Sequence, residues 1–202
     1  MSLGIRTRAR YRIPKVLDRG GEKTAYLVSL PILPSILKIK GTQTMGMEQT
    51  LIILKPDAVQ RGLMGKIITR FEEKGLKIIG AKFMQISQEL AANHYSDHTE
   101  KPFYPGLVSF MTSSPVLVMA LEGVGAIAMC RSMMGATFGS QAAAGTIRGD
   151  FGVSNSFNLI HGSDSQEAAT KELGLFFADG EVISWNRDNE NWVYDLSGDA
   201  PE

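Results

Sequence analysis

The chain has 202 residues, and its 21 lysines and arginines balance its 21 aspartates and glutamates. A single cysteine, Cys130, excludes an intrachain disulfide and a cysteine-based zinc site, and no apolar run approaches the roughly 18 residues of a membrane-spanning helix. The balance of charge hides an asymmetry, because residues 1–46 carry a net charge of +7 and residues 47–202 carry −7. An acidic domain is a poor electrostatic match for nucleic acid, so we expect no nucleic-acid partner and no membrane partner.

The first 46 residues form a basic N-terminal extension, with nine lysines and arginines against Asp18 and Glu22. Such a composition occurs in organelle-targeting and membrane-surface segments and superficially resembles a secretory signal. The other interpretations are a disordered extension and a start codon placed too early, since Met45 and Met47 precede the first patterned segment. We favour these two, which leave residues 47–202 as one domain with its own core.

Apolar patterns predict alternating strands and helices in the first half of this domain. Continuous apolar runs are typical of buried strands, and apolar residues three and four positions apart are typical of amphipathic helices. We therefore expect a strand at 50–54, a helix from Leu63 to a stop at Gly75, a strand at 76–86 with a bulge candidate at Gly80, a short helix from the cap Ser87 through Tyr95, and a strand at 115–121.

The second half of the domain is less regular. Helical spacing returns at 126–134 and ends at Gly135, whereas residues 136–157 have no sustained period and are expected to form a long functional loop. Ser163, with Gln166 three residues later, is typical of a capping box that opens a helix. The order of elements predicts an α+β fold with helices over an antiparallel sheet.

One of the three histidines, His161, lies in the segment Asn158-Leu159-Ile160-His161-Gly162-Ser163-Asp164-Ser165. A histidine between small residues and before a helix start can act as a nucleophile, because a neutral imidazole attacks phosphorus without a separate base. Taken alone, such a segment more often holds a structural histidine.

Four further blocks precede this segment. They are Leu51-Ile52-Ile53-Leu54-Lys55-Pro56-Asp57-Ala58-Val59-Gln60-Arg61-Gly62, Asn93-His94-Tyr95, Arg131-Ser132-Met133-Met134-Gly135-Ala136-Thr137 and Gly145-Thr146-Ile147-Arg148-Gly149-Asp150-Phe151. In this order, the five blocks closely resemble those of nucleoside diphosphate kinases, from about Glu48 to about Tyr194.

The resemblance implies a fold, an activity and partners. The fold would be a ferredoxin-like antiparallel sheet covered by helices, in a single domain. The activity would be ping-pong transfer of the γ-phosphoryl group of a nucleoside triphosphate, mainly ATP, to a nucleoside diphosphate, through a phosphohistidine. The protein would be cytoplasmic, and would form a homo-oligomer, either a tetramer or a hexamer.

The resemblance also assigns roles around the histidine. His161 would be the nucleophile, and Glu172 would hold its other ring nitrogen. Ser163 would place its hydroxyl beside the same glutamate, and Tyr95 would lie beside the transferred group. Without the resemblance, Glu172 is more simply a solvated carboxylate and Ser163 a helix cap.

The nucleotide contacts implied by the resemblance are scattered, as they must be in a chain without a Gly-x4-Gly-Lys-[Ser/Thr] loop. Lys55 and Asn158 would contact the sugar hydroxyls, with Lys55 also reaching a phosphate. Phe103 would stack on the base, which tolerates any base because every base has a π-face. Guanidinium groups suit phosphate oxygens, and the implied β- and γ-phosphate contacts are Arg131, Thr137 and Arg148.

Magnesium is the expected cofactor. Mg²⁺ keeps several waters and binds nucleotide phosphates in preference to a protein cage, so no direct protein ligand is assigned. Asp97 and Asp164 are candidates for contact through water. His94 and His98 are interpreted as packing or solvated residues.

The sequence departs from the family pattern in one loop. Family members usually carry Thr-Asn-Pro at its start and often a proline before the Gly-Thr-Ile-Arg block, whereas this chain reads Thr137-Phe138-Gly139-Ser140-Gln141-Ala142-Ala143-Ala144-Gly145. Both prolines are absent, so the rigidity that they give this loop in the family, and the oligomer stability that depends on it, are not expected to carry over unchanged. A proline restricts the unfolded chain, so we expect Gly139→Pro to stabilise the protein if the loop follows the family's path.

Two other functions remain open at this point. One is a nucleotide- or nucleic-acid-binding module that uses the basic extension as an arm, and the other is a homologue that has lost activity. The acidic domain argues against the first, and the complete set of matched residues argues against the second.

Overall fold

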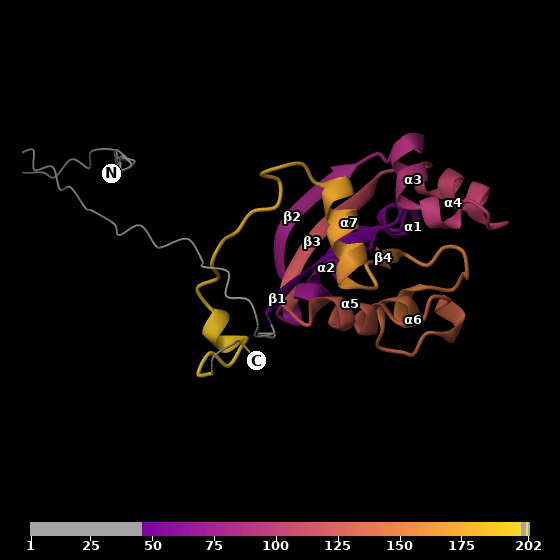
Figure 1. Cartoon of the computed structure of the whole chain (residues 1–202). Helices are drawn as coiled ribbons and strands as arrows, with labels where there is room; N and C mark the ends of the chain where they lie inside the picture. Colours follow the sequence, from indigo (N-terminus) through magenta and orange to yellow (C-terminus); the bar gives the residue numbers. More distant parts are fainter. Residues whose placement is uncertain (1–45, 199–200, 202) are drawn as a thin grey trace, which may run out of the picture. The chain divides into compact units, whose positions relative to one another are not determined.

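The computed structural model describes residues 46–198 and residue 201, so the predicted extension lies, except for Gly46, outside the described residues. The described part contains a four-stranded antiparallel sheet in the order β2-β3-β1-β4 (Figure 1). Its strands are β1 (Met47–Leu54), β2 (Lys77–Met84), β3 (Val116–Val124) and β4 (Ile160–Gly162). This order confirms the expected ferredoxin-like topology.

The sheet is buried on both faces. Side chains alternate along β1, so Ile52 and Leu54 enter one apolar cluster while Leu51 and Ile53 enter another. Helices α2 (Met64–Glu73) and α5 (Ala126–Met134) supply side chains to the first cluster, and α3 (Gln88–His94) and α7 (Gln166–Phe176) to the second. Burial on both sides explains why β1 is a continuous apolar run.

Several predicted boundaries are confirmed. A register shift between Ile78 and Gly80 marks the bulge in β2. Ser87 caps α3, since its hydroxyl accepts a hydrogen bond from the Leu90 N–H. Gly135 ends α5 with a φ of 80°, a conformation that glycine adopts without steric cost.

The sequence patterns missed the shorter elements. These are α1 (Pro56–Gln60), η1 (Ser96–His98), α4 (Tyr104–Met111), η2 (Gly139–Gln141), α6 (Ile147–Phe151) and η3 (Glu190–Trp192). The loop predicted at 136–157 therefore contains one short α-helix and one 3-10 turn. No helix of the described part has the length and apolar composition to cross a membrane.

The predicted capping box at Ser163 is wrong. The helix α7 is capped by Ser165, whose hydroxyl accepts a hydrogen bond from the Ala168 N–H at 3.1 Å. The hydroxyl of Ser163 is engaged elsewhere, because it donates to the side chain of Glu172. Two serines near one helix start thus have different roles.

Candidate active site

Strand β4 and helix α7 bring together a histidine, a glutamate and a serine. The pairing of β4 with β1 sets His161 opposite Ile53. His161 Nε2 lies 3.0 Å from Glu172 Oε1, and Ser163 Oγ donates to Glu172 Oε2 at 2.6 Å. Each carboxylate oxygen has its own partner, so the carboxylate is held in place and the imidazole faces it with Nε2.

The charge state of the glutamate follows from these contacts. Burial raises the pKa of the Glu172 carboxyl. The hydrogen bond and charge of His161, together with the hydrogen bond from Ser163, lower it by more than burial raises it, so the pKa lies below its ordinary value. An ionised carboxylate accepts a hydrogen bond from Nε2–H and donates none. The arrangement therefore favours the tautomer of His161 whose lone pair is on Nδ1.

The backbone that enters β4 is strained. Leu159 is a fully buried non-glycine residue with a φ of 69°, a conformation that costs about 1 to 3 kcal/mol. Its N–H donates to Asp57 Oδ2 at 3.0 Å, and its carbonyl accepts from the Lys55 N–H at 2.8 Å. The turn after β1 thus fixes the approach to His161. Asp57 was not assigned from the sequence, although the Lys-Pro-Asp run was a signal for it.

Three of the predicted nucleotide contacts form a second group. Lys55 Nζ donates to Asn158 Oδ1 at 2.7 Å, and Asn158 Nδ2 donates to the carbonyl of Thr137 at 3.0 Å. Burial and the positive charge of Arg148 lower the pKa of Lys55 to about 8, with Asp57 opposing the shift. Because burial and Arg148 destabilise the charged form of Lys55, a bound anion such as a phosphate would stabilise it.

Arg148 connects the loop at 136–157 to the end of the sheet. Its guanidinium group is buried, and it donates to three backbone carbonyls at 2.7 to 3.1 Å, those of Gly135, Asn158 and Ile160. Burial and the neighbouring Arg131 lower the pKa of Arg148 to about 10. Arg131 is exposed and donates to the Gly162 carbonyl at 3.4 Å. Two cations therefore flank the strand that carries His161.

A row of aromatic rings leads from the surface to His161. Ring centroids are 5.7 Å apart between Phe103 and His98, 6.3 Å between His98 and Tyr95, 4.4 Å between Tyr95 and His94, and 4.7 Å between His94 and His161. Phe103 is 56% exposed, and burial raises the pKa of Tyr95. His94, which the sequence predicts to be a packing or solvated residue, is a packing residue, since its side chain is buried against the ring of His161.

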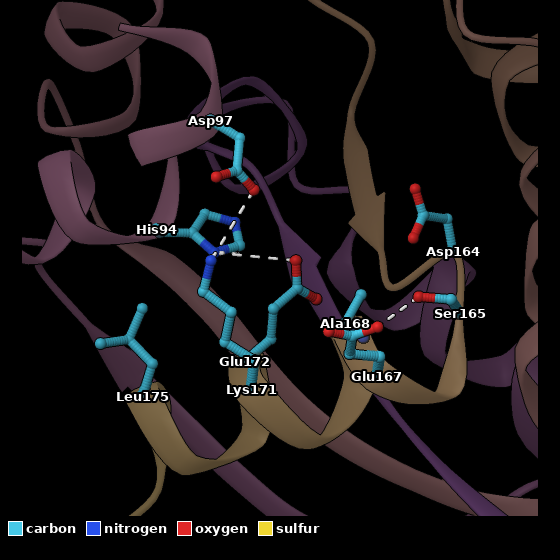
Figure 2. Close-up of a pocket in the computed structure, with 9 residues that line it drawn as sticks. All are labelled: His94, Asp97, Asp164, Ser165, Glu167, Ala168, Lys171, Glu172 and Leu175. Atoms are coloured by element: carbon cyan, nitrogen blue, oxygen red, sulfur yellow. Dashed lines mark hydrogen bonds and ion pairs between the residues drawn. The ribbon is translucent and has the colours of Figure 1, made fainter.

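A hollow of about 280 Å³ lies beside the same glutamate (Figure 2). His94 and Glu172 line it, and Lys171 Nζ lies 3.7 Å from Asp97 Oδ2. Carboxylates dominate its polar lining, and they come from Asp97, Asp164, Glu167 and Glu172. Both acidic residues considered for contact with metal-bound water therefore line one hollow.

Comparisons with known proteins match the chain to one family. The family model for nucleoside diphosphate kinase matches residues 48–182. The nucleoside diphosphate kinase of Archaeoglobus fulgidus is 49% identical over 149 residues, which cover 74% of this chain and 99% of that protein. That of Staphylococcus epidermidis is 52% identical over 149 residues, 74% of this chain and 100% of that protein.

Solved structures show the same similarity. A halophilic nucleoside diphosphate kinase from Halobacterium salinarum, in complex with CDP, aligns with a TM-score of 0.72 and 53% identity, covering 73% of this chain and 99% of that one. A transition-state mimic of the enzyme from Borrelia burgdorferi, with bound vanadate and ADP, aligns with a TM-score of 0.68 and 37% identity, covering 73% and 96%. The chain belongs to the nucleoside diphosphate kinase family of phosphotransferases.

Proposed function

We propose that this chain transfers the γ-phosphoryl group of a nucleoside triphosphate to a nucleoside diphosphate through a phosphohistidine at Nδ1 of His161. The observation that carries the proposal is the 3.0 Å contact between His161 Nε2 and Glu172 Oε1. This contact keeps a proton on Nε2 and a lone pair on Nδ1. A neutral ring nitrogen held in this way is an activated nucleophile.

In the first half of the reaction, the Nδ1 lone pair attacks the γ-phosphorus and the bond to the bridging oxygen of the leaving diphosphate breaks. Positive charge develops on the imidazole ring, and the Glu172 carboxylate stabilises it across Nε2–H. In the second half, a terminal oxygen of a different diphosphate attacks the phosphohistidine, and the electron pair returns to Nδ1. Ser163 acts through Glu172, whose second oxygen it holds at 2.6 Å.

The nucleotide would be held by the two groups of residues around the histidine. We assign the β- and γ-phosphates to Arg131, Arg148 and Thr137, because guanidinium groups flanking β4 can compensate phosphate charge. Lys55 and Asn158, joined at 2.7 Å, would contact the sugar, with Lys55 also reaching a phosphate. Tyr95 would lie beside the transferred group, and the exposed ring of Phe103 would stack on the base.

The residues present fit Mg²⁺ carried by the nucleotide. Bound to the phosphates, Mg²⁺ would neutralise part of their charge. The exposed carboxylates of Asp97 and Asp164 can accept hydrogen bonds from metal-bound water.

Partners and location are part of the same proposal. The relatives with bound CDP and with bound ADP support nucleoside diphosphates as ligands, and nucleoside triphosphates follow from the proposed reaction. We also propose a cytoplasmic homo-oligomer, a tetramer or a hexamer, whose active domain begins at residue 47. A chain starting at Met47 should then keep full activity.

Incubation with ATP that carries a radioactive γ-phosphoryl group tests the function. After removal of free nucleotide, the chain should retain label that is stable to base and labile to acid, as phosphohistidine is, and added GDP should take the label up. A chain that hydrolyses or binds ATP without becoming labelled would rule the mechanism out.

A further inference from the structure

We propose that His94, His161 and Glu172 form a binding site for a divalent transition-metal ion such as Zn²⁺, and that the bound ion inhibits phosphoryl transfer by making His161 unable to attack phosphorus. The site itself is independent of the proposed function, whereas its inhibitory effect rests on it. This ion differs from Mg²⁺ on the nucleotide in both ligands and consequence.

The three side chains have the spacing of metal ligands. One ligand atom from each lies within 4.8 Å of the others. Glu172 Oε1 is 3.0 Å from His161 Nε2 and 3.8 Å from His94 Nδ1. Four-coordinate Zn²⁺ holds its ligands at about 2.0 to 2.2 Å, which sets neighbouring ligand atoms about 3.3 to 3.6 Å apart. Small side-chain movements would complete the coordination.

His94 supplies a second and independent sign of a ligand. Its side chain is 2% exposed, and neither ring nitrogen has a hydrogen-bond partner in the described part of the chain. A buried polar atom without a partner costs about 1 to 3 kcal/mol. A metal ion bound to Nδ1 would offset part of that cost.

The hollow described above gives the ion a route. Its lining includes His94 and Glu172, and Figure 2 shows the imidazole of His94 near the carboxylate of Glu172. The hollow is also lined by the carboxylates of Asp97, Asp164 and Glu167, whose negative charges attract divalent cations. Lys171 is the opposing charge, and it lies 3.7 Å from Asp97.

The ligand set selects the metal. Two imidazoles and one carboxylate, with a fourth position open to water, are a common zinc arrangement. Imidazole also suits Cu²⁺, Ni²⁺ and Co²⁺, whereas Mg²⁺ prefers oxygen ligands and would not compete here. The full chain has only three histidines and one cysteine, so few other strong sites exist for such an ion.

Metal binding would reverse the tautomer that the reaction needs. An ion on Nε2 of His161 takes the lone pair of that nitrogen, so the neutral ring carries its proton on Nδ1. The ring keeps one proton, which is on Nδ1 instead of Nε2 when the ion is bound. The atom proposed to attack phosphorus then has no lone pair, and Glu172 is withdrawn from its role as hydrogen-bond acceptor.

The test uses Co²⁺ as a spectroscopic probe on the full chain freed of metal. The visible absorption of Co²⁺ intensifies when a four-coordinate protein site replaces its water shell. We expect saturation at one equivalent per chain for the wild type, loss of the signal in His94→Phe, and an unchanged signal in His98→Phe, the matched histidine control. Circular dichroism checks the fold, and His94→Gln replaces His94→Phe if that variant does not fold.

Inhibition is measured separately. With excess Mg²⁺, Zn²⁺ should inhibit phosphoryl exchange by the wild type, a chelator should restore it, and His94→Phe should need at least about tenfold more Zn²⁺ while keeping most metal-free activity. Equal binding and equal inhibition in His94→Phe, or no intensified Co²⁺ absorption in the wild type, would overturn the site. If metal-free wild type shows no exchange while the Co²⁺ signal depends on His94, the proposed function fails and the metal site stands.

Discussion

The proposed nucleophile and the proposed phosphate contacts are held in different ways. His161 lies on a strand of the sheet, and Glu172 lies on the 11-residue helix α7, so regular backbone fixes the 3.0 Å contact between them. Among the proposed phosphate contacts, Arg131 lies on α5, whereas Thr137 and Arg148 belong to the segment 136–157, in which the only α-helix is the short α6. That segment is fixed by bonds from side chains to backbone, above all those of Arg148.

Tight glycine contacts also hold the segment 136–157. A Cβ atom at Gly139 would meet the carbonyl group of Gly152 and would lie 2.9 Å from its Cα. Arg70 ties the same segment to α2, with an ion pair to Asp150 and its guanidinium carbon 4.8 Å from the ring centroid of Phe151. Substitutions at the His161–Glu172 pair should therefore change chemistry at nearly constant stability, whereas substitutions in this segment should change stability.

The largest expected effect is on the chemistry. We expect His161→Asn to lower phosphoryl exchange by at least about 1,000-fold, or about 4 kcal/mol of barrier, because the nucleophile is lost while the cationic contacts remain. Nucleotide affinity and the thermal midpoint should change little. Calorimetric titration with ADP measures nucleotide affinity, and a coupled assay measures phosphoryl exchange. Exchange within about tenfold of wild type would remove His161 from the mechanism.

The sequence predicted the sheet and the helices packed on it better than the segment 136–157. Continuous apolar strands and helical spacing are local signals. The five blocks include His161 and Ser163, whereas Glu172 lies outside them and was assigned through the family resemblance alone. The helix α6 has only five residues, and α4 holds Pro105 and Gly106 in its first turn, so neither produces a sustained pattern. The contact between Gly139 and Gly152, and the bond from Leu159 to Asp57 across 102 positions, exist only in the folded chain.

The second prediction reverses the expectation drawn from the family pattern. Gly139→Pro should destabilise the protein by about 1 to 3 kcal/mol, since a side chain there must displace the Gly152 backbone. Ala144→Pro is the matched control at the other absent proline, where the residue is exposed, and it should change stability by less than about 1 kcal/mol. Urea unfolding at equal subunit concentration measures both. A raised midpoint in Gly139→Pro would show that the loop follows the family's path.

The third prediction concerns the glutamate. Glu172→Gln keeps a hydrogen-bond acceptor near Nε2 but removes the charge, so we expect kcat to fall by about tenfold to 100-fold with little change in stability. Glu167→Gln, on the same helix and exposed, should leave kcat unaltered. Single-turnover measurement of phosphohistidine formation separates this step from product release. An unchanged rate in Glu172→Gln would mean that the carboxylate does not act on the ring.

The smallest expected effect is a pH dependence. Lys55 has a pKa lowered to about 8, so it loses its positive charge as pH rises through that value. Only the charged form attracts phosphate, and kcat/KM should therefore decline above about pH 8, since this ratio reports the free enzyme. In Lys55→Arg the decline should disappear, because a guanidinium group stays charged. A decline at the same pH in both proteins would assign it to another group.

The position of phosphorus on the histidine ring tests the central claim most directly. The phosphorylated chain can be prepared with ¹⁵N-labelled histidine, and the coupling between ³¹P and the ring nitrogens identifies the bonded atom. Because Glu172 faces Nε2 at 3.0 Å, we predict phosphorus on Nδ1 of His161. Phosphorus on Nε2, or on another residue, would contradict the account.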